Sequence, residues 1–381
     1  MSARTVPMAR ELAALGHKPV IIVPPWDTPD RALPLEISHE IPVRNVRVPV
    51  GLLQHPGSMF RLLRAVLAER PDVVVCVKPK AYAALFALLF GQLNQRRGGP
   101  MRLVVDTDDW EGSGGWNDMG ATPRFLRGFV ALNEQLALRA ADQVIVASRE
   151  LENLVSGSGV PESRLSYIPN GSWEGAAGWL KGDRQSGRAR LGMQNEPLIL
   201  LYSRLFEFDR ERVVENIRRI LDAVPNARLL VVGIGLSGEE DLFRRSLSEY
   251  GILNRSHLVG WVERPQLPDI LAAADVAIVP MDDSRVNRSR CSVKLLDLML
   301  SSVPIVADRV GQVPSFLTNG VSGVTVDPSD PVAMSREAID LFRNPERARK
   351  LGIAAERRAR FDLHWDRHRS AIEHAVLGSA S

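Results

Sequence analysis

The segment 287–302, "NRSRCSVKLLDLMLSS", joins a cationic loop to a predicted helix. Its residues of chemical interest are Arg288, Arg290, Ser292, Lys294 and Asp297. The first amides of a helix have no partner within the helix and lie at the positive end of its dipole, so they favour an anion. Basic side chains at the same place indicate a site for a negatively charged group. Lys294 and Asp297 are also three residues apart, and as an exposed ion pair they would contribute little.

Arg204 closes the apolar run "LILLYS" (198–203), which is typical of a buried parallel strand. The carboxyl ends of parallel strands lie at one edge of a sheet, where nucleotides bind. Arg204, Lys294 and the amides at the start of the helix could therefore converge on a diphosphate. Asp297, one turn into the helix, could accept hydrogen bonds from ribose hydroxyls.

Two further positions lie where predicted strands end in the second half of the chain. Gly233 and Gly235 occupy the turn "VGIG", where a strand passes into a helix. They allow either the close approach of a phosphate or a plain tight turn. Trp261 follows the strand "HLVG" and could be a core aromatic or a wall for a nucleobase.

Short apolar runs alternate with amphipathic helical patterns along the whole chain. Alternation on this scale predicts an α/β fold with a doubly wound parallel sheet, and it occurs twice. The predicted strands are "VIIV" (20–23), "DVVVCV" (72–77), "RLVVD" (102–106), "QVIVAS" (143–148), "LILLYS" (198–203), "RLLVVG" (228–233), "HLVGWV" (257–262), "VAIVPM" (276–281) and "PIVAD" (304–308). We therefore expect two Rossmann-like domains in tandem, facing across a cleft.

The domain boundaries follow from a change in composition. Residues 171–197 are rich in glycine and polar residues, so we place an N-terminal domain at 1–175, a linker at 176–196 and a C-terminal domain at 197–355. Residues 356–381 are predicted to form a C-terminal helical segment. The chain opens on a helical pattern, so the first strand and glycine-rich loop of a Rossmann-like domain are missing, and we favour a truncated start over a true loss.

The composition and the apolar runs of the chain argue against two classes of protein, nucleic-acid-binding and membrane-spanning. The 48 basic and 45 acidic residues give a net charge of +3, which argues against a dedicated nucleic-acid-binding protein. The longest apolar run, 81–90, is too short to span a bilayer, and a cytoplasmic location is expected. The basic segment 343–361 is interpreted as a solvated helix face, with a peripheral membrane contact as the alternative. Cys76 and Cys291 are expected to be reduced thiols.

These motifs, taken in order, resemble those of the retaining glycosyltransferases of family four, which have the two-domain GT-B fold. The resemblance covers essentially the whole chain. The matching segments are "YIPNGS" (167–172), "LLYSRLFEFD" (200–209), "LLVVGIG" (229–235), "HLVGWVERPQLPDILAAADVAIVP" (257–280) and "SVKLLDLMLSSVPIVA" (292–307).

The resemblance implies roles for several residues. Arg204 matches the family's phosphate-binding arginine, and Ser292 and Val293 match the loop whose amides face the pyrophosphate. Asp297 matches the second glutamate of the family's Glu-seven-Glu motif. With Gly233, Trp261, Arg290 and Lys294, these residues form the predicted donor site.

The chain also departs from the family's pattern. Ser289 stands where the family has the first glutamate of the motif, which usually lies against the donor sugar. Asp209 stands at the position of the family's donor-binding lysine, and Arg210 or Lys294 are candidates for the missing cation.

The densest polar cluster of the first domain is "VVDTDDWEGSGGWND" (104–118). Four of its carboxylates, those of Asp106, Asp108, Asp109 and Glu111, lie at the carboxyl end of a buried strand and repel one another unless something offsets them, which indicates function. Asp108 and Asp109 are the predicted catalytic residues, which position an acceptor hydroxyl. The alternatives are a cation site, or helix caps and turns around the glycines of the segment. The pair His364 and His368 has a metal-capable spacing, but polar surface residues of a terminal helix explain it as well.

The resemblance predicts an enzyme that moves a sugar from a nucleotide-diphosphate-sugar donor to an acceptor with retention of configuration. The acceptor is an unidentified glycan, lipid or small molecule. No metal or other cofactor is predicted, because GT-B enzymes generally need no metal for catalysis. A non-catalytic nucleotide- or glycan-binding relative is the alternative, indicated by Ser289 and the missing glycine-rich loop. A sugar-nucleotide 2-epimerase is less favoured, because no separate set of acid and base residues is found.

Overall fold

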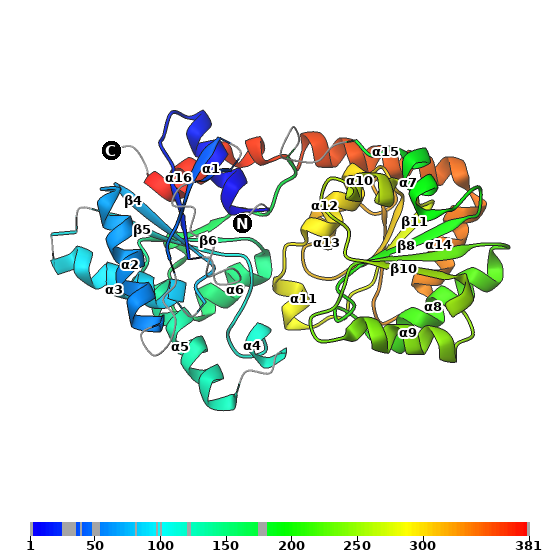
Figure 1. The fold of residues 1–381 in the computed structure, drawn as a ribbon, viewed down its shortest axis with the longest axis horizontal. Helices are drawn as coiled ribbons and strands as arrows, with labels where there is room; N and C mark the ends of the chain where they lie inside the picture. The colour runs from blue at the N-terminus through cyan, green and yellow to red at the C-terminus, as the bar shows by residue number, and fades with distance from the viewer. Residues whose placement is uncertain are drawn as a thin grey trace. The chain divides into compact units, whose positions relative to one another are not determined.

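The computed structural model describes residues 3–24, 36–38, 40–47, 54–80, 82–96, 98–99, 101–119, 123–173 and 181–378. The chain divides into two compact α/β units (Figure 1). Unit 1 comprises Met1–Asn170, Ser289–Cys291 and Trp365–Ser381, and unit 2 comprises Gly171–Arg288 and Ser292–His364. None of the helices in the described residues has the length and hydrophobicity needed to cross a bilayer.

Unit 1 is built from short parallel strands and the helices that connect them. Its main elements are α1 (Thr5–Ala14), β1 (Ile21–Val23), β2 (Glu36–Ser38), β3 (Ile41–Asn45), α2 (Gln54–Ala68), β4 (Val73–Val77), α3 (Tyr82–Arg96), β5 (Arg102–Thr107), α4 (Trp116–Met119), α5 (Arg124–Ala140), β6 (Gln143–Val146), α6 (Arg149–Gly157), β7 (Leu165–Tyr167) and α16 (Arg369–Leu377).

The strands of unit 1 form two separate sheets among the described residues. Strands β4, β5, β6 and β7 pair in that order and are all parallel. The other sheet has the order β1-β3-β2, with β2 antiparallel to β3. In the doubly wound order 3-2-1-4-5-6, β1 and β4 correspond to the second and fourth strands, and the first strand lies between these two. Among the described residues, β1 and β4 are each at the edge of their sheet.

The C-terminal helix α16 belongs to unit 1 and not to a separate terminal segment. It packs against α1 and against the strands β4, β5 and β6. Arg369 pairs with Glu11 of α1 at 2.7 Å, and Ile372 is fully buried. The predicted segment 356–381 is therefore divided between the units, because α15 (Pro345–Phe361) packs on α12 (Val293–Leu300) within unit 2.

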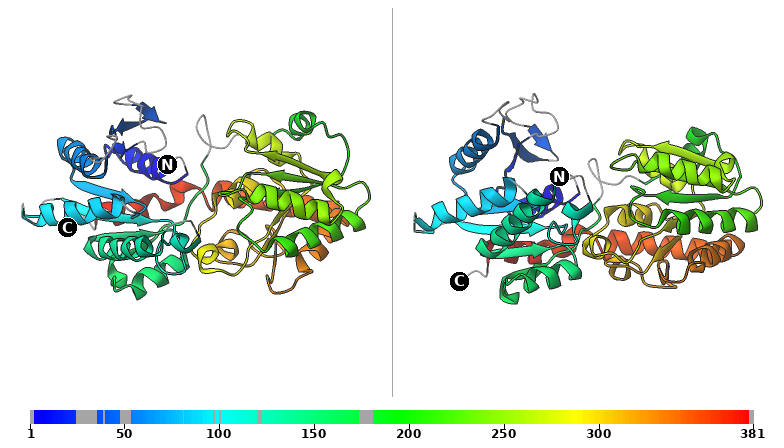
Figure 2. Two further views of the ribbon diagram at one scale, coloured as in Figure 1. Left: turned by 60° about the horizontal axis from the view of Figure 1, so that its bottom comes forward. Right: turned by 90° about the horizontal axis from the view of Figure 1, so that it is seen from below.

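Unit 2 contains a single sheet with helices on both faces (Figure 2). Its other elements are α7 (Arg184–Leu191), β8 (Leu198–Tyr202), α8 (Arg210–Ala223), β9 (Arg228–Val232), α9 (Glu239–Glu249), β10 (Ser256–Gly260), α10 (Leu267–Ala272), β11 (Val276–Val279), α11 (Arg285–Ser289), β12 (Ile305–Asp308), α13 (Val313–Phe316), β13 (Val324–Val326) and α14 (Ala333–Arg343).

The sheet of unit 2 has the order β10-β9-β8-β11-β12-β13, and all its strands are parallel. Counted from β8, this is the order 3-2-1-4-5-6 of a Rossmann fold. The central strands are continuous apolar runs because helices bury both of their faces. Leu198, Ile199, Leu200 and Leu201 of β8 are all fully buried. The predicted doubly wound α/β fold class is confirmed.

The segment predicted as a linker contains helix α7, which packs against α10 in unit 2. Asp183 caps the helix by accepting from the amides of Gln185 and Ser186. The glycines that suggested a linker are needed for packing. A Cβ on Gly187 would lie 1.9 Å from the carbonyl oxygen of Asp269, and one on Gly182 would lie 2.1 Å from that of Pro268.

Candidate functional site

The direction of the strand order in unit 2 changes between β8 and β11. Ligands of open parallel α/β sheets bind outside the carboxyl ends of the strands at such a point. The residues after β8 and β11 and the start of α12 line a narrow pocket there. Its free space is about 10 Å³, room for no more than one water molecule. The side chains that line this pocket therefore pack closely against one another.

Glu207 is the central residue of the pocket, and the sequence analysis did not single it out. Its carboxylate is buried and pairs with Lys294, with 2.6 Å between Oε1 and Nζ. Oε2 accepts hydrogen bonds from the hydroxyl of Ser203 and, at 3.2 Å, from the amide of Arg204. The predicted alternative of an exposed Lys294–Asp297 pair is therefore wrong. Glu207 orients Lys294 and holds the loop that carries Arg204.

Asp297 is 2% exposed and lies inside unit 2, so α12 is more than a surface helix. Its Oδ2 accepts from Nη1 of Arg264 at 2.8 Å and lies 3.4 Å from the hydroxyl of Tyr202. Burial raises the pKa of Asp297, and the nearby Arg264 opposes this shift. Burial and the adjacent carboxylate also raise the pKa of Tyr202. Asp297 thus belongs to a polar group that the sequence did not predict.

Arg204 lies two residues after the end of β8, and its side chain is exposed at the carboxyl edge of the sheet. It lies near Glu239 at the start of α9. Although burial opposes the shift, hydrogen bonds from backbone amides and the nearby Arg204 lower the pKa of Glu239. The phosphate contact of Arg204 stays a prediction.

Gly233 forms a tight turn between β9 and α9. Its φ is +116°, and a Cβ there would lie 2.1 Å from the carbonyl oxygen of Ser203. The amides that follow are already bonded to carboxylates: Gly235 donates to Glu240 at 2.9 Å, and Ser237 donates to Glu239 at 2.6 Å. This favours the interpretation of the G-x-G segment as a packed turn.

Trp261 follows β10 and is 66% exposed, so it is not a core aromatic. Its Nε1 donates to Oε1 of Glu263 at 3.1 Å, which holds the ring at the surface. An exposed indole at the end of a strand can stack on a planar ligand. The alternative of a nucleobase wall thus stays a prediction.

The start of α12 agrees with the predicted helix boundary. Ser292 is the N-cap, with extended backbone, and its side chain makes no capping hydrogen bond. Val293 is the first helical residue, so its amide has no partner within the helix. Asp209, which replaces the family's lysine, caps α8 by accepting from the amide of Arg212 at 2.7 Å.

Arg290 and Ser289 belong to unit 1, apart from the other predicted donor residues, which belong to unit 2. The guanidinium of Arg290 lies over the ring of Trp116, 5.4 Å from its centroid. Ser289 is fully buried, and its carbonyl accepts from the hydroxyl of Ser148 at 2.7 Å. The structure thus gives both residues packing contacts that the sequence did not indicate.

The carboxylates of the acidic segment in unit 1 are each matched by a cation. Asp106 is fully buried and is held by Arg4, with 2.6 Å between Oδ1 and Nη2. Lys78 lies 3.2 Å from Asp108 and 3.0 Å from Asp109. These cations offset the repulsion that indicated function, and Asp106 is a structural residue.

Asp108 and Asp109 remain at the surface of this network, 15% and 24% exposed. Burial and then Asp109 raise the pKa of Asp108, whereas Lys78 lowers it. Burial opposes the charge on Lys78, but Asp109 and Asp108 raise its pKa. The two aspartates, with a shared lysine, can accept a hydrogen bond from a bound hydroxyl.

The second half of the acidic segment is a tight turn, as the alternative interpretation predicted. A Cβ on Gly115 would lie 2.1 Å from the carbonyl oxygen of Trp110. Beneath the turn, Glu134 of α5 is fully buried and its Oε1 accepts from the amide of Glu111 at 3.2 Å. Burial raises the pKa of Glu134 to about 8. Glu111 itself pairs with Lys80 at 2.8 Å.

No group of three or more potential metal-binding side chains occurs in the part of the chain that the structure describes. His364 and His368 do not share a helix face, because His364 forms a β-bridge with Ser172 and His368 lies in a 3₁₀ helix. Both cysteines are free and buried, and burial raises the pKa of each thiol to about 12.

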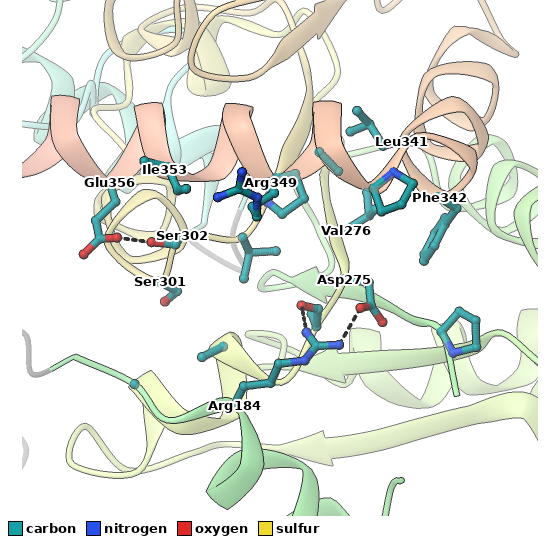
Figure 3. A pocket seen from close by; sticks show the side chains of 18 of the residues that line it. Arg184, Asp275, Val276, Ser301, Ser302, Leu341, Phe342, Arg349, Ile353 and Glu356 are labelled. Carbon is teal, nitrogen blue, oxygen red and sulfur yellow. Dashed lines mark hydrogen bonds and ion pairs between the residues drawn. The ribbon is translucent and has the colours of Figure 1, made fainter. Parts of the chain in front are cut away.

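A larger cavity of about 610 Å³ lies at the opposite edge of the sheet in unit 2 (Figure 3). Pro197, Val276 and Pro304 place it at the amino ends of β8, β11 and β12. Its best-placed cation, Arg184, is bound to Asp275 at 2.5 Å. Ligands of this fold bind at the carboxyl edge, so size alone does not identify the site.

Comparisons with known proteins give matches over both units. Residues 1–171 match the "Glycosyl transferase 4-like domain" and residues 196–344 match "Glycosyl transferases group 1". A GDP-mannose-dependent alpha-(1-6)-phosphatidylinositol monomannoside mannosyltransferase of Mycolicibacterium smegmatis is 24% identical over 325 residues, which are 84% of this chain and 81% of the relative.

Solved structures of similar fold cover most of the chain. HepE of Anabaena, in complex with UDP and glucose, has a TM-score of 0.68 and 19% identity, over 90% of this chain and 87% of its own. Sucrose-phosphate synthase of Thermosynechococcus elongatus has a TM-score of 0.71 and 18% identity, over 96% and 90%. These relatives are named as enzymes, so the non-catalytic alternative is not favoured. The chain belongs to the group 1 glycosyltransferases, with the GT-B fold.

Proposed function

We propose that the protein transfers a sugar, with retention of anomeric configuration, from a nucleotide-diphosphate-sugar held by unit 2 to an acceptor held by unit 1. The observation that carries the proposal is the placement of Arg204, Lys294 and the start of α12 at the carboxyl edge of the sheet, where its strand order reverses. A pyrophosphate needs cations and amides in this position.

Each part of the donor has its own contacts in the proposed site. Arg204 and Lys294 contact the diphosphate, with the Ser292 and Val293 amides at the helix start. Lys294 takes the place of the cation that Asp209 does not supply. Asp297 accepts from the ribose, and Trp261 lies against the base. Arg264, 2.8 Å from Asp297, opposes the rise in pKa that burial causes, which supports a role of the carboxylate as an acceptor of hydrogen bonds.

The reaction breaks the bond between the anomeric carbon and the phosphate oxygen, and the bonding pair stays on the diphosphate. Arg204, Lys294 and the helix amides stabilise the charge that gathers there. The acceptor oxygen forms the new bond on the same face of the sugar, and its proton passes to the departing diphosphate oxygen. Asp108 or Asp109 accepts the hydrogen bond of that hydroxyl and orients it.

The nucleobase and the acceptor are left open. One relative is named for GDP-mannose and another structure contains UDP, so the base does not follow from the family. The proposal is tested by incubating the protein with UDP-, GDP- and ADP-sugars, measuring the ligand-induced shift in melting temperature, and determining the anomeric configuration of the product by NMR. An inverted product would overturn the retaining assignment, and no shift with any donor would overturn the donor site.

A further inference from the structure

Helix α5 of unit 1 carries a stripe of large apolar side chains on its solvent side. Leu126, Phe129, Leu132 and Leu136 are 40%, 59%, 54% and 39% exposed. Their spacing of three to four residues places them on one face of the helix. The acidic residue of α5, Glu134, is fully buried instead. The helix thus exposes the kind of residue that a surface helix normally buries.

Helix α3 continues this stripe, since it packs against α5 (Figure 1). Leu85 and Leu89, four residues apart, are 38% and 37% exposed. The opposite side of α3 already fills the core, where Phe86 and Phe90 stack with ring centroids 5.6 Å apart. The exposed leucines are therefore not needed for packing. We call the "apolar face" the set Leu85, Leu89, Leu126, Phe129, Leu132 and Leu136.

The charged side chains that the three helices themselves expose have one sign. Helices α2, α3 and α5 contain six arginines and no lysine or aspartate, and their single glutamate is the buried Glu134. Of the described arginine side chains, Arg64 and Arg96 are exposed on α2 and α3. Arg127 on α5 lies 3.6 Å from Asp118 of α4. An apolar surface bordered by arginines matches a surface of lipid tails and anionic headgroups.

The basic helix α15 of unit 2, for which the sequence analysis kept a membrane contact as the alternative, does not have this character. Its cations are largely paired: Lys350 with Glu346 at 2.7 Å, and Arg360 with Glu356 at 2.9 Å. These pairs favour the interpretation of 343–361 as a solvated helix face.

A second copy of this chain is a poorer partner for the apolar face. In a two-fold dimer the same surface meets itself, so the arginines of α2 and α3 would face arginines. A bilayer containing anionic lipid supplies the opposite charge. The apolar face is also close in sequence to the segment that is proposed to orient the acceptor. Helix α3 follows Lys78 and Lys80, which pair with this acidic segment, and α5 follows α4 at the end of the segment. This location suits transfer to a membrane-borne acceptor.

We propose that the apolar face of unit 1 docks on the surface of an anionic lipid bilayer, with Phe129 and Leu132 entering the boundary between headgroups and acyl chains. The arginines of α2, α3 and α5 contact the headgroups. This docking does not depend on the proposed glycosyl transfer, since it uses no residue of the candidate donor site.

The test is flotation of the full-length protein with phosphatidylcholine vesicles, with and without about 30% phosphatidylglycerol. We expect the protein to float only with the anionic vesicles. Phe129→Ser with Leu132→Ser should lower the bound fraction at least about fivefold, and Arg64→Gln with Arg96→Gln should do the same. Phe361→Ser is a matched control, because Phe361 of α15 is also 59% exposed.

The melting temperature and the binding of nucleoside diphosphates are measured for every variant, so that misfolding and failure of the donor site are recognised separately. Failure of the unchanged protein to float with either vesicle would overturn the proposal. Equal loss of flotation in Phe361→Ser would also overturn it. A dimer in solution that Phe129→Ser dissociates would assign the face to a second copy.

Discussion

The carboxyl edge of the sheet in unit 2 and that of the sheet β4-β5-β6-β7 in unit 1 both carry ion pairs, but the balance of positive and negative charges differs between them. In unit 2 the carboxylate of Glu207 is 3% exposed, whereas Lys294 is 20% exposed and Arg204 lies at the surface. In unit 1 Asp108 and Asp109, 15% and 24% exposed, share Lys78, which is 55% exposed, so carboxylates outnumber the cation there. One edge therefore offers cations to an anionic ligand, and the other offers carboxylates to a hydroxyl.

The difference teaches that the number of charged residues does not identify a site. The acidic segment of unit 1 is the densest polar cluster in its half of the chain, yet Asp106 and Glu111 are occupied by Arg4 and Lys80. Which carboxylates remain available to a ligand depends on their cationic partners, and these partners come from other segments of the chain.

The largest effect is expected at the pair that holds unit 1 together. Arg4→Ala leaves the buried Asp106 without its partner and should lower the free energy of unfolding by about 3–5 kcal/mol. Urea denaturation measures this. The exposed Arg64→Ala should change it by less than about 0.5 kcal/mol. Equal effects of the two substitutions would show that the Arg4–Asp106 pair has no structural role.

A pH-dependent loss of stability is expected from Glu134. Its pKa is raised in the folded state from 4.5 to about 8, so the folded protein binds a proton there that the unfolded chain has released. The contribution is complete below pH 4.5 and decreases as the pH rises to about 8, by about 1.4 kcal/mol per pH unit at most.

Glu134→Gln should remove this slope, because the amide is neutral at every pH. The control is Glu162→Gln, since Glu162 is an exposed glutamate of the same unit. Denaturation series from pH 5 to pH 9 compare the variants. A slope that survives in Glu134→Gln would assign the pH dependence to another group.

The two aspartates of unit 1 should affect transfer and not donor binding. Asp108→Asn with Asp109→Asn is expected to reduce the rate of transfer about 100-fold, while the affinity for the donor stays within about twofold. Asp118→Asn is the matched control, because Asp118 bonds the amide of Gly114 within the same segment. A comparable loss in the control would mean that the shape of the loop, and not the two carboxylates, is required.

A smaller effect is expected for Asp297. Asp297→Ala should weaken the binding of a nucleoside diphosphate about tenfold and leave that of inorganic pyrophosphate unchanged, because only the ribose contact is lost. Asp297→Glu should bind within a few-fold of the unchanged protein. Calorimetry with both ligands checks this, and an equal loss for pyrophosphate would place Asp297 at the phosphates instead.

The sequence predicted the features that depend on local pattern. The apolar run of β8 and the start of α12 near Ser292 are both as expected. It did not predict the partners of charged residues, since Lys294 pairs with Glu207 across 87 positions and Arg4 pairs with Asp106 across 102. The glycines at 182 and 187 indicated a linker, because nothing local shows that a helix backbone lies against them.

The most direct test of the account is calorimetric titration of UDP, GDP and ADP into the unchanged protein and into Arg204→Ala. Arg244→Ala is the control, because Arg244 is an exposed arginine of α9 in the same unit. We predict that a nucleotide that binds the unchanged protein binds Arg204→Ala about tenfold or more weakly, as expected for one charged hydrogen bond, and binds Arg244→Ala equally well. The same dissociation constant in Arg204→Ala and in Lys294→Ala as in the unchanged protein would contradict the assignment of the diphosphate to this edge of unit 2.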